Sequence, residues 1–282
     1  MGRFLRHQTK TGGEPKIANE KTVRVPKRPI WTGTITIGLV NVPVKLYRMI
    51  FERGFSFRFL HEQDGQPLKY QKVCTKDNLV VPWEDTVRGY EVSKNEFIVF
   101  TKEELEAAKP ESDRKIRLNK FVDFYSIDPI YFETTYILAP DKNPEAYTLL
   151  LKALEKTEKA AAGTITLRTK EYPAIVQAHK GVLILNTLRY GYEVGDPSKL
   201  DELKKLKEPS KDELDLAAKI VGDLSGEFNI DEYEDAYKQK IEDLIEKKLK
   251  GETIVVEKPE VKEEAKELMA ALKQTLEQLK KK

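Results

Sequence analysis

Polar and apolar side chains alternate over short stretches between about Pro29 and Val194, which is the pattern of half-buried β-strands. Thr34–Ile37 alternates hydroxyl and apolar side chains, and Val42–Tyr47 follows it after a turn that contains glycine. Further runs rich in Val, Ile, Tyr and Phe recur at Phe55–Leu60, Val87–Val92, Glu96–Phe100, Ile116–Val122, Ile130–Leu138, Gly163–Leu167, Ala174–Ala178 and Val182–Leu188. Turn residues separate several of these runs, so we predict a mostly antiparallel barrel or sandwich.

Two helices are predicted to interrupt these strands. The capping box Thr101–Glu104 opens a short helix that ends before Pro110. Asn143 caps a longer helix that begins at Pro144. The region is therefore expected to be mainly β, with inserted helices.

After Gly195 the pattern changes from strands to helices. Ser210–Glu213 is another capping box, and Asn229 or Asp231 is expected to open the next helix, which ends before Gly251. The apolar stripes of these two helices predict an inward face made of Leu214, Ala217, Val221, Leu224, Tyr233, Tyr237, Ile241, Leu244 and Leu249. A last amphipathic helix carries a leucine stripe at Leu268, Leu272, Leu276 and Leu279.

These patterns divide the chain into four parts. Residues 1–28 form a flexible basic arm, and residues 29–194 form the β core. Residues 195–251 form a helical C-terminal part of the core, and residues 252–282 form an amphipathic helical extension.

The charge is distributed unevenly along the chain. The net charge is +2, but residues 1–60 carry 12 Lys and Arg against 3 Asp and Glu. An anionic partner is attracted to such a positive end, although a solubilising basic tail is the ordinary explanation of a charge run.

Motifs for catalysis, cofactors and metals are missing from the sequence. Cys74 is the single cysteine, and the three histidines lack the spacing of metal ligands. A phosphate-binding loop and a nucleophile elbow are both absent, and the adjacent carboxylates Glu84 and Asp85 have no second acidic cluster for a nuclease site. We therefore expect no catalytic residues, no cofactor and no metal.

Membrane insertion and secretion are also unexpected. No apolar run approaches the ~18 residues that cross a bilayer, and the N-terminus has no apolar signal segment. One cysteine suits a reducing compartment. We expect a cytoplasmic protein without a membrane partner.

Basic residues interleaved with aromatic and apolar strand positions are the positive signal. Lys45 and Arg48 flank Tyr47, and Arg58 lies among the phenylalanines Phe55, Phe57 and Phe59. Such cations can line a phosphate-binding surface, or they can be ordinary outward-facing side chains. The three phenylalanines share one face of a predicted strand, and we expect that face to belong to the core rather than to stack on bases.

Eight short segments between about Pro29 and Gly251 form an ordered set of motifs: Trp31–Arg48, Phe59–His61, Val81–Asp85, Arg88–Glu91, Asp128–Phe132, Tyr136–Lys142, Thr187–Tyr190 and Ser225–Phe228. In order and spacing they resemble the prokaryotic Ku family, which binds DNA ends in non-homologous end joining. Each motif is weak by itself, and the resemblance rests on the set. The resemblance implies a Ku-type β-barrel core with a ring-closing bridge arm at about residues 64–124, followed by a helical C-terminal region.

The resemblance also implies a function without catalysis. Members of this family form a homodimer that closes a preformed ring, and the end of a DNA duplex threads through it. Contacts go to phosphate and sugar, so all sequences are accepted. By this resemblance, DNA contact is expected at Lys45, Arg48, Arg58, Lys69, Lys72, Lys109, Arg114, Lys115, Arg168 and Lys170.

The family's other partner is an ATP-dependent DNA ligase, contacted through the C-terminal helical region. The stripe of Leu268, Leu272, Leu276 and Leu279 is a candidate docking face, or it packs on its own domain or on the second copy. The tail ends in Lys280–Lys282 but is otherwise mixed in charge, unlike the lysine-rich tails of many relatives. We expect a nucleoid-associated protein. The alternatives are an architectural duplex-DNA-binding protein without end specificity and a protein-interaction scaffold.

Overall fold

The computed structural model describes residues 25–51, 54–109, 113–252 and 268–279. The chain divides into two compact units, residues 1–195 and residues 196–282. The predicted basic arm, apart from residues 25–28, and most of the predicted C-terminal extension lie outside the described residues. None of the helices in the described ranges is long and apolar enough to cross a membrane.

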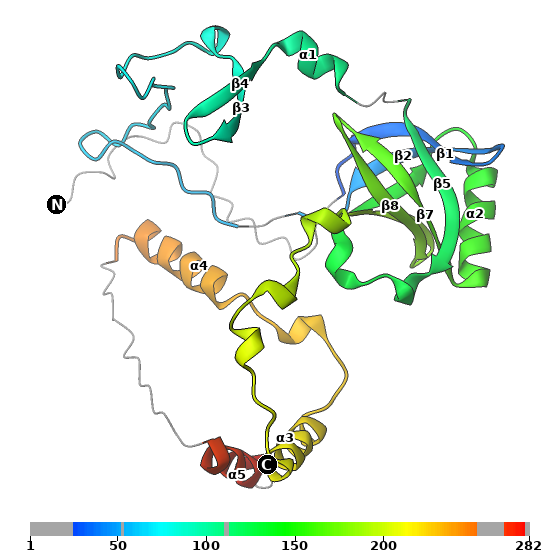
Figure 1. The fold of residues 1–282 in the computed structure, drawn as a ribbon, viewed down its shortest axis with the longest axis vertical. Helices are drawn as coiled ribbons and strands as arrows, with labels where there is room; N and C mark the ends of the chain where they lie inside the picture. Colours follow the sequence, from blue (N-terminus) through cyan, green and yellow to red (C-terminus); the bar gives the residue numbers. More distant parts are fainter. Residues whose placement is uncertain (1–24, 52–53, 110–112, 253–267, 280–282) are drawn as a thin grey trace. The chain divides into compact units, whose positions relative to one another are not determined.

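The first unit contains a closed barrel of seven strands in the order β1-β2-β6-β9-β8-β7-β5 (Figure 1). The strands are β1 Trp31–Ile37, β2 Val40–Arg48, β5 Lys115–Asp123, β6 Phe132–Pro140, β7 Lys159–Leu167, β8 Lys170–His179 and β9 Val182–Leu188. Neighbours pair antiparallel except β1 and β5, whose parallel pairing closes the barrel. The predicted β-barrel with helices is confirmed.

Alternate residues of each strand fill the barrel with aliphatic side chains. The fully buried members include Ile35, Val42, Val44, Leu46, Ile116, Leu138, Ile165, Val176, Leu183 and Leu185. Each contributes about 1.5–3 kcal/mol by leaving water. The alternation seen in the sequence therefore marks the inside of the barrel correctly.

Helix α2, Pro144–Thr157, packs on the barrel and adds Leu150 and Leu154 to its core (Figure 1). The buried Tyr147 hydroxyl donates to the Leu138 carbonyl at 2.7 Å and accepts from the Leu183 amide at 2.8 Å. This side chain satisfies backbone groups of β6 and β9 that a ladder would otherwise pair. As predicted, Asn143 caps this helix through the Ala146 amide.

The segment between β2 and β5, residues 49–114, is called the β2–β5 insert below. Its described elements are a 3-10 turn at Trp83–Asp85, strand β3 Arg88–Ser93, strand β4 Glu96–Phe100 and helix α1 Lys102–Ala107. Strand β5 pairs with β1 and β7, so it belongs to the barrel. The predicted bridge arm at 64–124 therefore extends too far at its C-terminal end.

Two turns of the insert share one hydrogen-bond pattern. The His61 amide bonds the Gln66 carbonyl while the Gly65 amide bonds the His61 carbonyl, both at 2.8 Å. Thirteen residues later, Cys74 and Asn78 repeat these two roles at 2.9 Å. Gly65 and Asn78 both have positive φ, which glycine and asparagine tolerate best. Local hydrogen bonds thus fix the path of a segment with little core.

The phenylalanine run of the insert is not the predicted buried strand. Only Leu60 of this run makes a β-bridge, to Pro67. Phe57 and Phe59 are exposed, and only Phe55 is half-buried. Alternation alone does not supply the second layer that a buried face requires.

The described residues of the second unit form three α-helices. They are α3 Lys211–Asp223, α4 Ala236–Leu249 and α5 Leu268–Leu279, and α5 lies beside α3 (Figure 1). The predicted capping box at Ser210 and Glu213 is confirmed. Short 3-10 turns lie at Phe124–Ser126, Pro129–Tyr131, Gly191–Glu193, Pro197–Lys199, Leu203–Lys205 and Ile230–Glu232.

Two predictions about these helices are wrong. Asp235 caps α4, while Asn229 caps the 3-10 turn before it. The predicted inward faces are also displaced, because most of their members are exposed: Leu214, Val221, Leu224, Tyr233, Tyr237 and Leu249. On α3 the half-buried apolar residues are Leu216, Ala217 and Ile220, one residue out of phase with much of the predicted stripe. Ala217, Ile241 and Leu244 are half-buried as predicted.

Gly163 provides a stability test, because β7 passes very close to the bulged strand β5. A Cβ atom at Gly163 would lie 1.8 Å from the Arg117 carbonyl oxygen, which no side-chain adjustment relieves. We expect Gly163→Ala to lower the free energy of unfolding by about 1–3 kcal/mol or more. Urea denaturation measures this change. Gly191→Ala is the control, since its Cβ meets nothing within 4 Å; equal stability of both variants would contradict the expectation.

Candidate nucleic-acid interface

One outer side of the barrel carries hydroxyls and cations in register. Ile35, Ile116, Val44 and Leu46 point inward, so their strand neighbours point outward. Across β2, β1 and β5 the register pairs Thr32 with Lys45, Thr34 with Lys115 and Thr36 with Arg117. We call this set the cationic strand face: Thr32, Thr34, Thr36, Lys45, Lys115 and Arg117.

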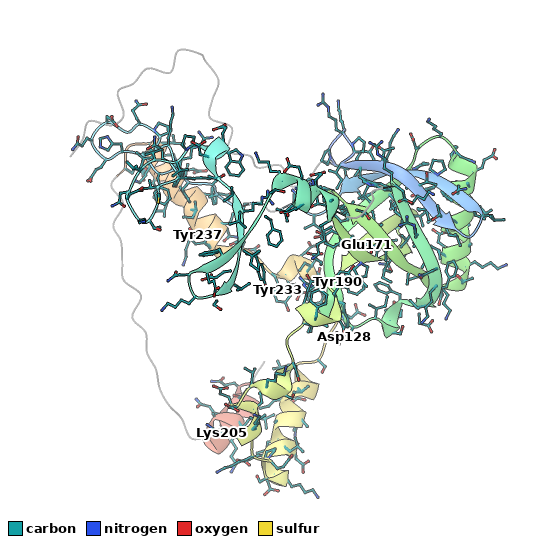
Figure 2. The ribbon with its side chains drawn as sticks, turned by 45° about the horizontal axis from the view of Figure 1, so that its top comes forward. Asp128, Glu171, Tyr190, Lys205, Tyr233 and Tyr237 are labelled. Carbon is teal, nitrogen blue, oxygen red and sulfur yellow. The ribbon has the colours of Figure 1, made fainter. Side chains whose placement is uncertain are left out.

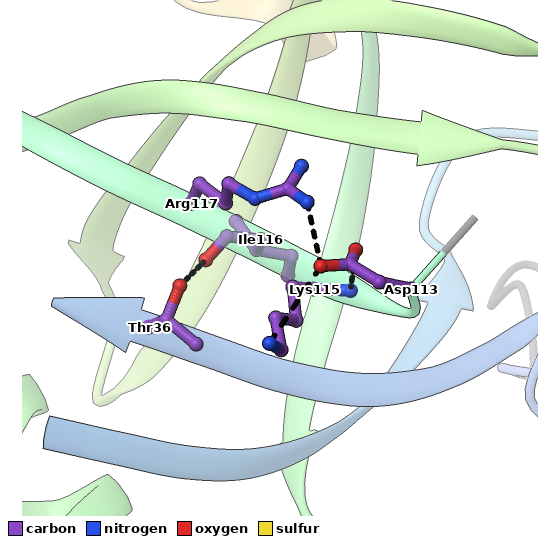
Figure 3. Close-up of polar contacts among 5 residues, drawn as sticks. All are labelled: Thr36, Asp113, Lys115, Ile116 and Arg117. Atoms are coloured by element: carbon purple, nitrogen blue, oxygen red, sulfur yellow. Dashed lines mark hydrogen bonds and ion pairs between the residues drawn. The ribbon is translucent and has the colours of Figure 1, made fainter. Parts of the chain in front are cut away.

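Asp113 organises the β5 end of this face (Figure 3). Its Oδ2 lies 2.6 Å from Nη2 of Arg117 and 3.7 Å from Nζ of Lys115. Its Oδ1 accepts from the Lys115 amide at 3.2 Å, which fixes the carboxylate at the start of the strand. Thr36 donates its hydroxyl to the Ile116 carbonyl at 3.3 Å and so links β1 to β5.

Lys45 occupies the β2 side of the face. Its Nζ lies 2.6 Å from Oδ1 of Asp141, and this hydrogen bond and charge raise the pKa of Lys45 above its ordinary value. The ammonium therefore stays charged at neutral pH. Arg48, at the exposed end of the same strand, has no ion pair with any described residue.

Arg168 and Lys170 lie at the turn between β7 and β8. Arg168 has a φ of 58°, and Lys170 bonds Glu193 at 2.9 Å beneath the Tyr172 ring, 4.9 Å from its centroid. This bond raises the pKa of Lys170 and lowers the pKa of Glu193. The Tyr190 hydroxyl bonds the Glu171 carbonyl at 3.3 Å, and both residues are labelled in Figure 2.

Arg114 precedes β5, where its own backbone closes the barrel. It has a φ of 54°, and its carbonyl accepts from the Thr34 amide at 2.9 Å. A Cβ at Gly33 would collide with that carbonyl at 2.2 Å, so glycine is required there.

The other predicted contact residues lie in the β2–β5 insert. Arg58 and Lys69 are exposed and have no ion pair among the described residues. Lys72 lies 3.3 Å above the centroid of the Trp83 ring, and Lys109 pairs with Glu106. The ten predicted cations thus lie in three places: on the cationic strand face or at the adjoining ends of β2 and β5, at the β7–β8 turn, and in the insert.

Arg117 is a face residue that sequence reasoning left out of the predicted contacts. Its alternation with Ile116 and Leu118 was the available signal, because both of those side chains are buried. Its partner Asp113 lies four residues earlier, outside any regular helix, so spacing alone did not pair them.

The opposite outer side of the barrel has different chemistry. Outward positions of β6, β8 and β9 hold Thr135, Ile137, Ile175, Ile184 and Asn186. Ile175 and Ile184 are buried, and Thr135 donates to the amide oxygen of Asn186 at 2.7 Å. These five outward side chains are uncharged, whereas the cationic strand face carries Lys45, Lys115 and Arg117.

Arg189 joins two of the motifs identified in the sequence, Asp128–Phe132 and Thr187–Tyr190. Nη1 of Arg189 donates to the carbonyls of Ile130 and Phe132, and its amide bonds the Tyr131 carbonyl at 2.7 Å. The segments Thr187–Tyr190 and Asp128–Phe132 are therefore held together by backbone contacts.

Two further predictions concern metal ligands and the leucine stripe, and the structure describes the side chains of only two of the four leucines. Within the described residues, no three His, Cys, Asp or Glu residues are close enough to hold a metal ion. Leu276 is 8% exposed and Leu272 is half-buried on a helix that lies beside α3. The side chains of Leu268 and Leu279 lie outside the described set.

Comparisons with known proteins agree with this barrel. A family model described as the Ku70/Ku80 beta-barrel domain matches residues 36–216. The "Non-homologous end joining protein Ku" of Archaeoglobus fulgidus is 38% identical over 254 residues, covering 90% of this chain and all of that protein. The proteins of that name in Anaeromyxobacter sp. (strain K) and Bacillus subtilis are 40% and 31% identical, over 80% and 92% of this chain and 77% and 84% of their own lengths. This chain belongs to the Ku family.

Proposed function

We propose that this protein binds double-stranded DNA ends without regard to sequence, as a homodimeric ring that the duplex threads. In this proposal it is a binding protein, not an enzyme, and it recruits an ATP-dependent DNA ligase for break repair by non-homologous end joining. The cationic strand face on a Ku-family barrel is the observation that carries it. The names of the relatives supply the repair pathway.

The chemistry of the face suits the DNA backbone. Lysine, arginine and threonine are side chains that commonly bond phosphate oxygens, and such contacts carry no sequence information. Three hydroxyls and three cations adjoin on strands β2, β1 and β5, with spacings set by the sheet. A rigid array of this kind recognises the backbone of any duplex.

The β2–β5 insert supports the homodimer. Its two-stranded ribbon β3–β4 exposes Tyr90, Phe97, Ile98 and Val99, which lie on both faces. An isolated ribbon is marginally stable, and its open edges invite pairing with another chain. A second copy provides an identical ribbon through a two-fold axis, and two inserts meeting in this way close a ring.

The second unit supports further contacts with partners. Phe228, Tyr233 and Tyr237 are exposed within an acidic segment, and Phe228 touches Tyr233 with ring centroids 5.6 Å apart. We propose that this unit contributes to the dimer and contacts the ligase. The burial of Leu276 favours packing of the leucine stripe within its own unit over direct docking.

Threading predicts that end access decides binding. In gel-shift assays, we expect linear duplex to be retained and covalently closed circles of the same sequence to be released. Rings loaded on linear DNA should stay trapped after both ends are blocked. If circles bind as well as linear DNA, the architectural alternative replaces threading.

The cationic strand face predicts a defined salt dependence. Arg117→Ala should weaken binding to all duplex sequences alike and reduce the slope of log K against log salt by about one unit. Fluorescence anisotropy over a salt series measures both effects. Lys152→Ala is a matched control, since Lys152 is also exposed and paired with a carboxylate, Glu155 at 2.7 Å, but lies on α2.

Asp113→Asn separates charge from structure in the same assay. The amide keeps an acceptor for the Lys115 backbone but removes a negative charge next to phosphate. We expect equal or tighter binding. Weaker binding, together with an unchanged slope for Arg117→Ala, would show that DNA does not contact this face.

The ring requires a dimer that depends on the ribbon. Sedimentation should give about twice the chain mass of 32.4 kDa. Phe97→Lys should raise the dimer dissociation constant at least about tenfold, because it puts a charge into an apolar contact. Leu149→Lys, at an exposed apolar position of α2, should leave the dimer intact. A wild-type monomer would refute the ring.

A further inference from the structure

A cavity of about 970 Å³ lies between the β2–β5 insert and Thr169 of the β7–β8 turn. The 3-10 turn at Trp83–Asp85, the adjoining ends of β3 and β4, and helix α1 form most of its wall. Its lining includes two aromatic and four basic residues of the insert: Trp83, Phe100, Lys72, Arg88, Lys102 and Lys109. Neither the strand face nor the dimer accounts for this arrangement.

Trp83 presents its indole to the cavity. The residue is 63% exposed, so it is not part of a core. Nζ of Lys72 lies 3.3 Å from the ring centroid, which places a cation on the indole face. A large exposed aromatic side chain held beside cations is the usual platform for a nucleic-acid base.

The remaining groups add positive charge near this platform. Arg88 lies opposite Phe100 in the ribbon register, so both side chains emerge on one face. Two carboxylates, Glu84 and Glu106, also line the cavity, and Glu106 pairs with Lys109. Lys72, Arg88 and Lys102 make no ion pair with a described residue, and the cavity keeps an excess of positive charge.

We propose that this cavity binds one unpaired nucleotide at a DNA terminus, with the base on Trp83 and the phosphate near Lys72 and Arg88. The inference rests on the proposed function and adds a preference for single-stranded overhangs. Bases inside a duplex have both faces covered, and the last base pair of a blunt end is held to its complementary strand. An unpaired terminal base can therefore enter the cavity without the cost of unpairing.

The ammonium group of Lys72 is expected to move when a nucleotide binds in the cavity. Without a ligand this ammonium covers the indole face. A base stacked on an aromatic ring gains more than a cation on an exposed ring, and the ammonium gains a phosphate partner when it moves aside. The exchange therefore favours the nucleotide.

The test uses the full chain and three DNA ends: blunt, a 3′ overhang of four nucleotides and a 5′ overhang of four. The wild type should bind at least one overhang about fivefold or more tighter than the blunt end. Trp83→Ala should remove this preference and leave blunt-end affinity within twofold. Trp83→Phe should keep part of the preference, and Tyr125→Ala, which truncates an exposed aromatic residue outside the cavity, should keep all of it.

A 5-bromouracil placed in the preferred overhang should crosslink to Trp83, whereas the same base inside the duplex should not. The cavity assignment is overturned if the wild type shows no overhang preference, or if Trp83→Ala keeps it. Equal loss of blunt and overhang binding also overturns it, because Trp83 would then only support the insert. If free dAMP binds as tightly as the overhang, the ligand is a soluble nucleotide and the terminal assignment fails.

Failure of the proposed function gives a different pattern. Closed circles would then compete equally with blunt linear DNA for the wild type. If circles are excluded while the Trp83 variants behave like the wild type, end binding stands and only the nucleotide site is lost.

Discussion

The parallel pairing of β1 with β5 is the contact on which the rest of the structure depends. Every other neighbouring pair in the barrel is antiparallel, and this one pairs residues 81 positions apart in the sequence, such as Thr34 with Lys115. It requires close approach of the backbones: the Thr34 amide bonds the Arg114 carbonyl at 2.9 Å, and only glycine fits at position 33. The same pairing places Ile35 and Ile116 inside the barrel. By alternation, it also places Thr34, Thr36, Lys115 and Arg117 side by side on the outside. The strand pairing that completes the core therefore also assembles the cationic strand face.

The carboxylates beside these cations do not argue against a polyanion. Asp113 and Asp141 hold Arg117, Lys115 and Lys45 in fixed directions at the sheet surface. The pairs of Asp113 with Arg117 and Lys115 are exposed, and exposed ion pairs contribute little to stability, so a phosphate can replace this carboxylate at small cost. A phosphate also gives arginine a bidentate partner. In the proposed complex, carboxylates that orient these side chains before binding lower the entropy lost when a phosphate is bound.

Local patterns in the sequence predicted the barrel well, because the alternation of apolar side chains within each strand shows which of them face the core. β4 and β9 have the predicted bounds, and the caps of α1, α2 and α3 lie where the side-chain spacing put them. The failures share one cause. Phe57 and Phe59 alternate as a strand does, and Leu214 and Val221 follow helical spacing, yet all four are exposed. Spacing defines an apolar face, but it does not provide the surface that covers the face. The carboxylate partners of the predicted cations could not be predicted from the sequence for a related reason. Lys45 and Asp141, like Lys170 and Glu193, are distant in sequence and meet only after the strands pair.

The exposed apolar residues of the insert and its nucleotide cavity follow from the same deficit of core. The insert holds its path through repeated turns, a two-stranded ribbon and a capped six-residue helix, all of which rely on local hydrogen bonds. Such a segment cannot bury Phe97 or Trp83 by itself. An apolar surface of this extent is stabilised by a partner, and the two kinds of surface favour different ones. The ribbon has open edges and apolar faces, which suit an identical ribbon. Trp83 has cations around it, which suit a base with its phosphate and are costly to bury against apolar side chains. The charge next to each aromatic side chain, more than its exposure, decides which partner it accepts.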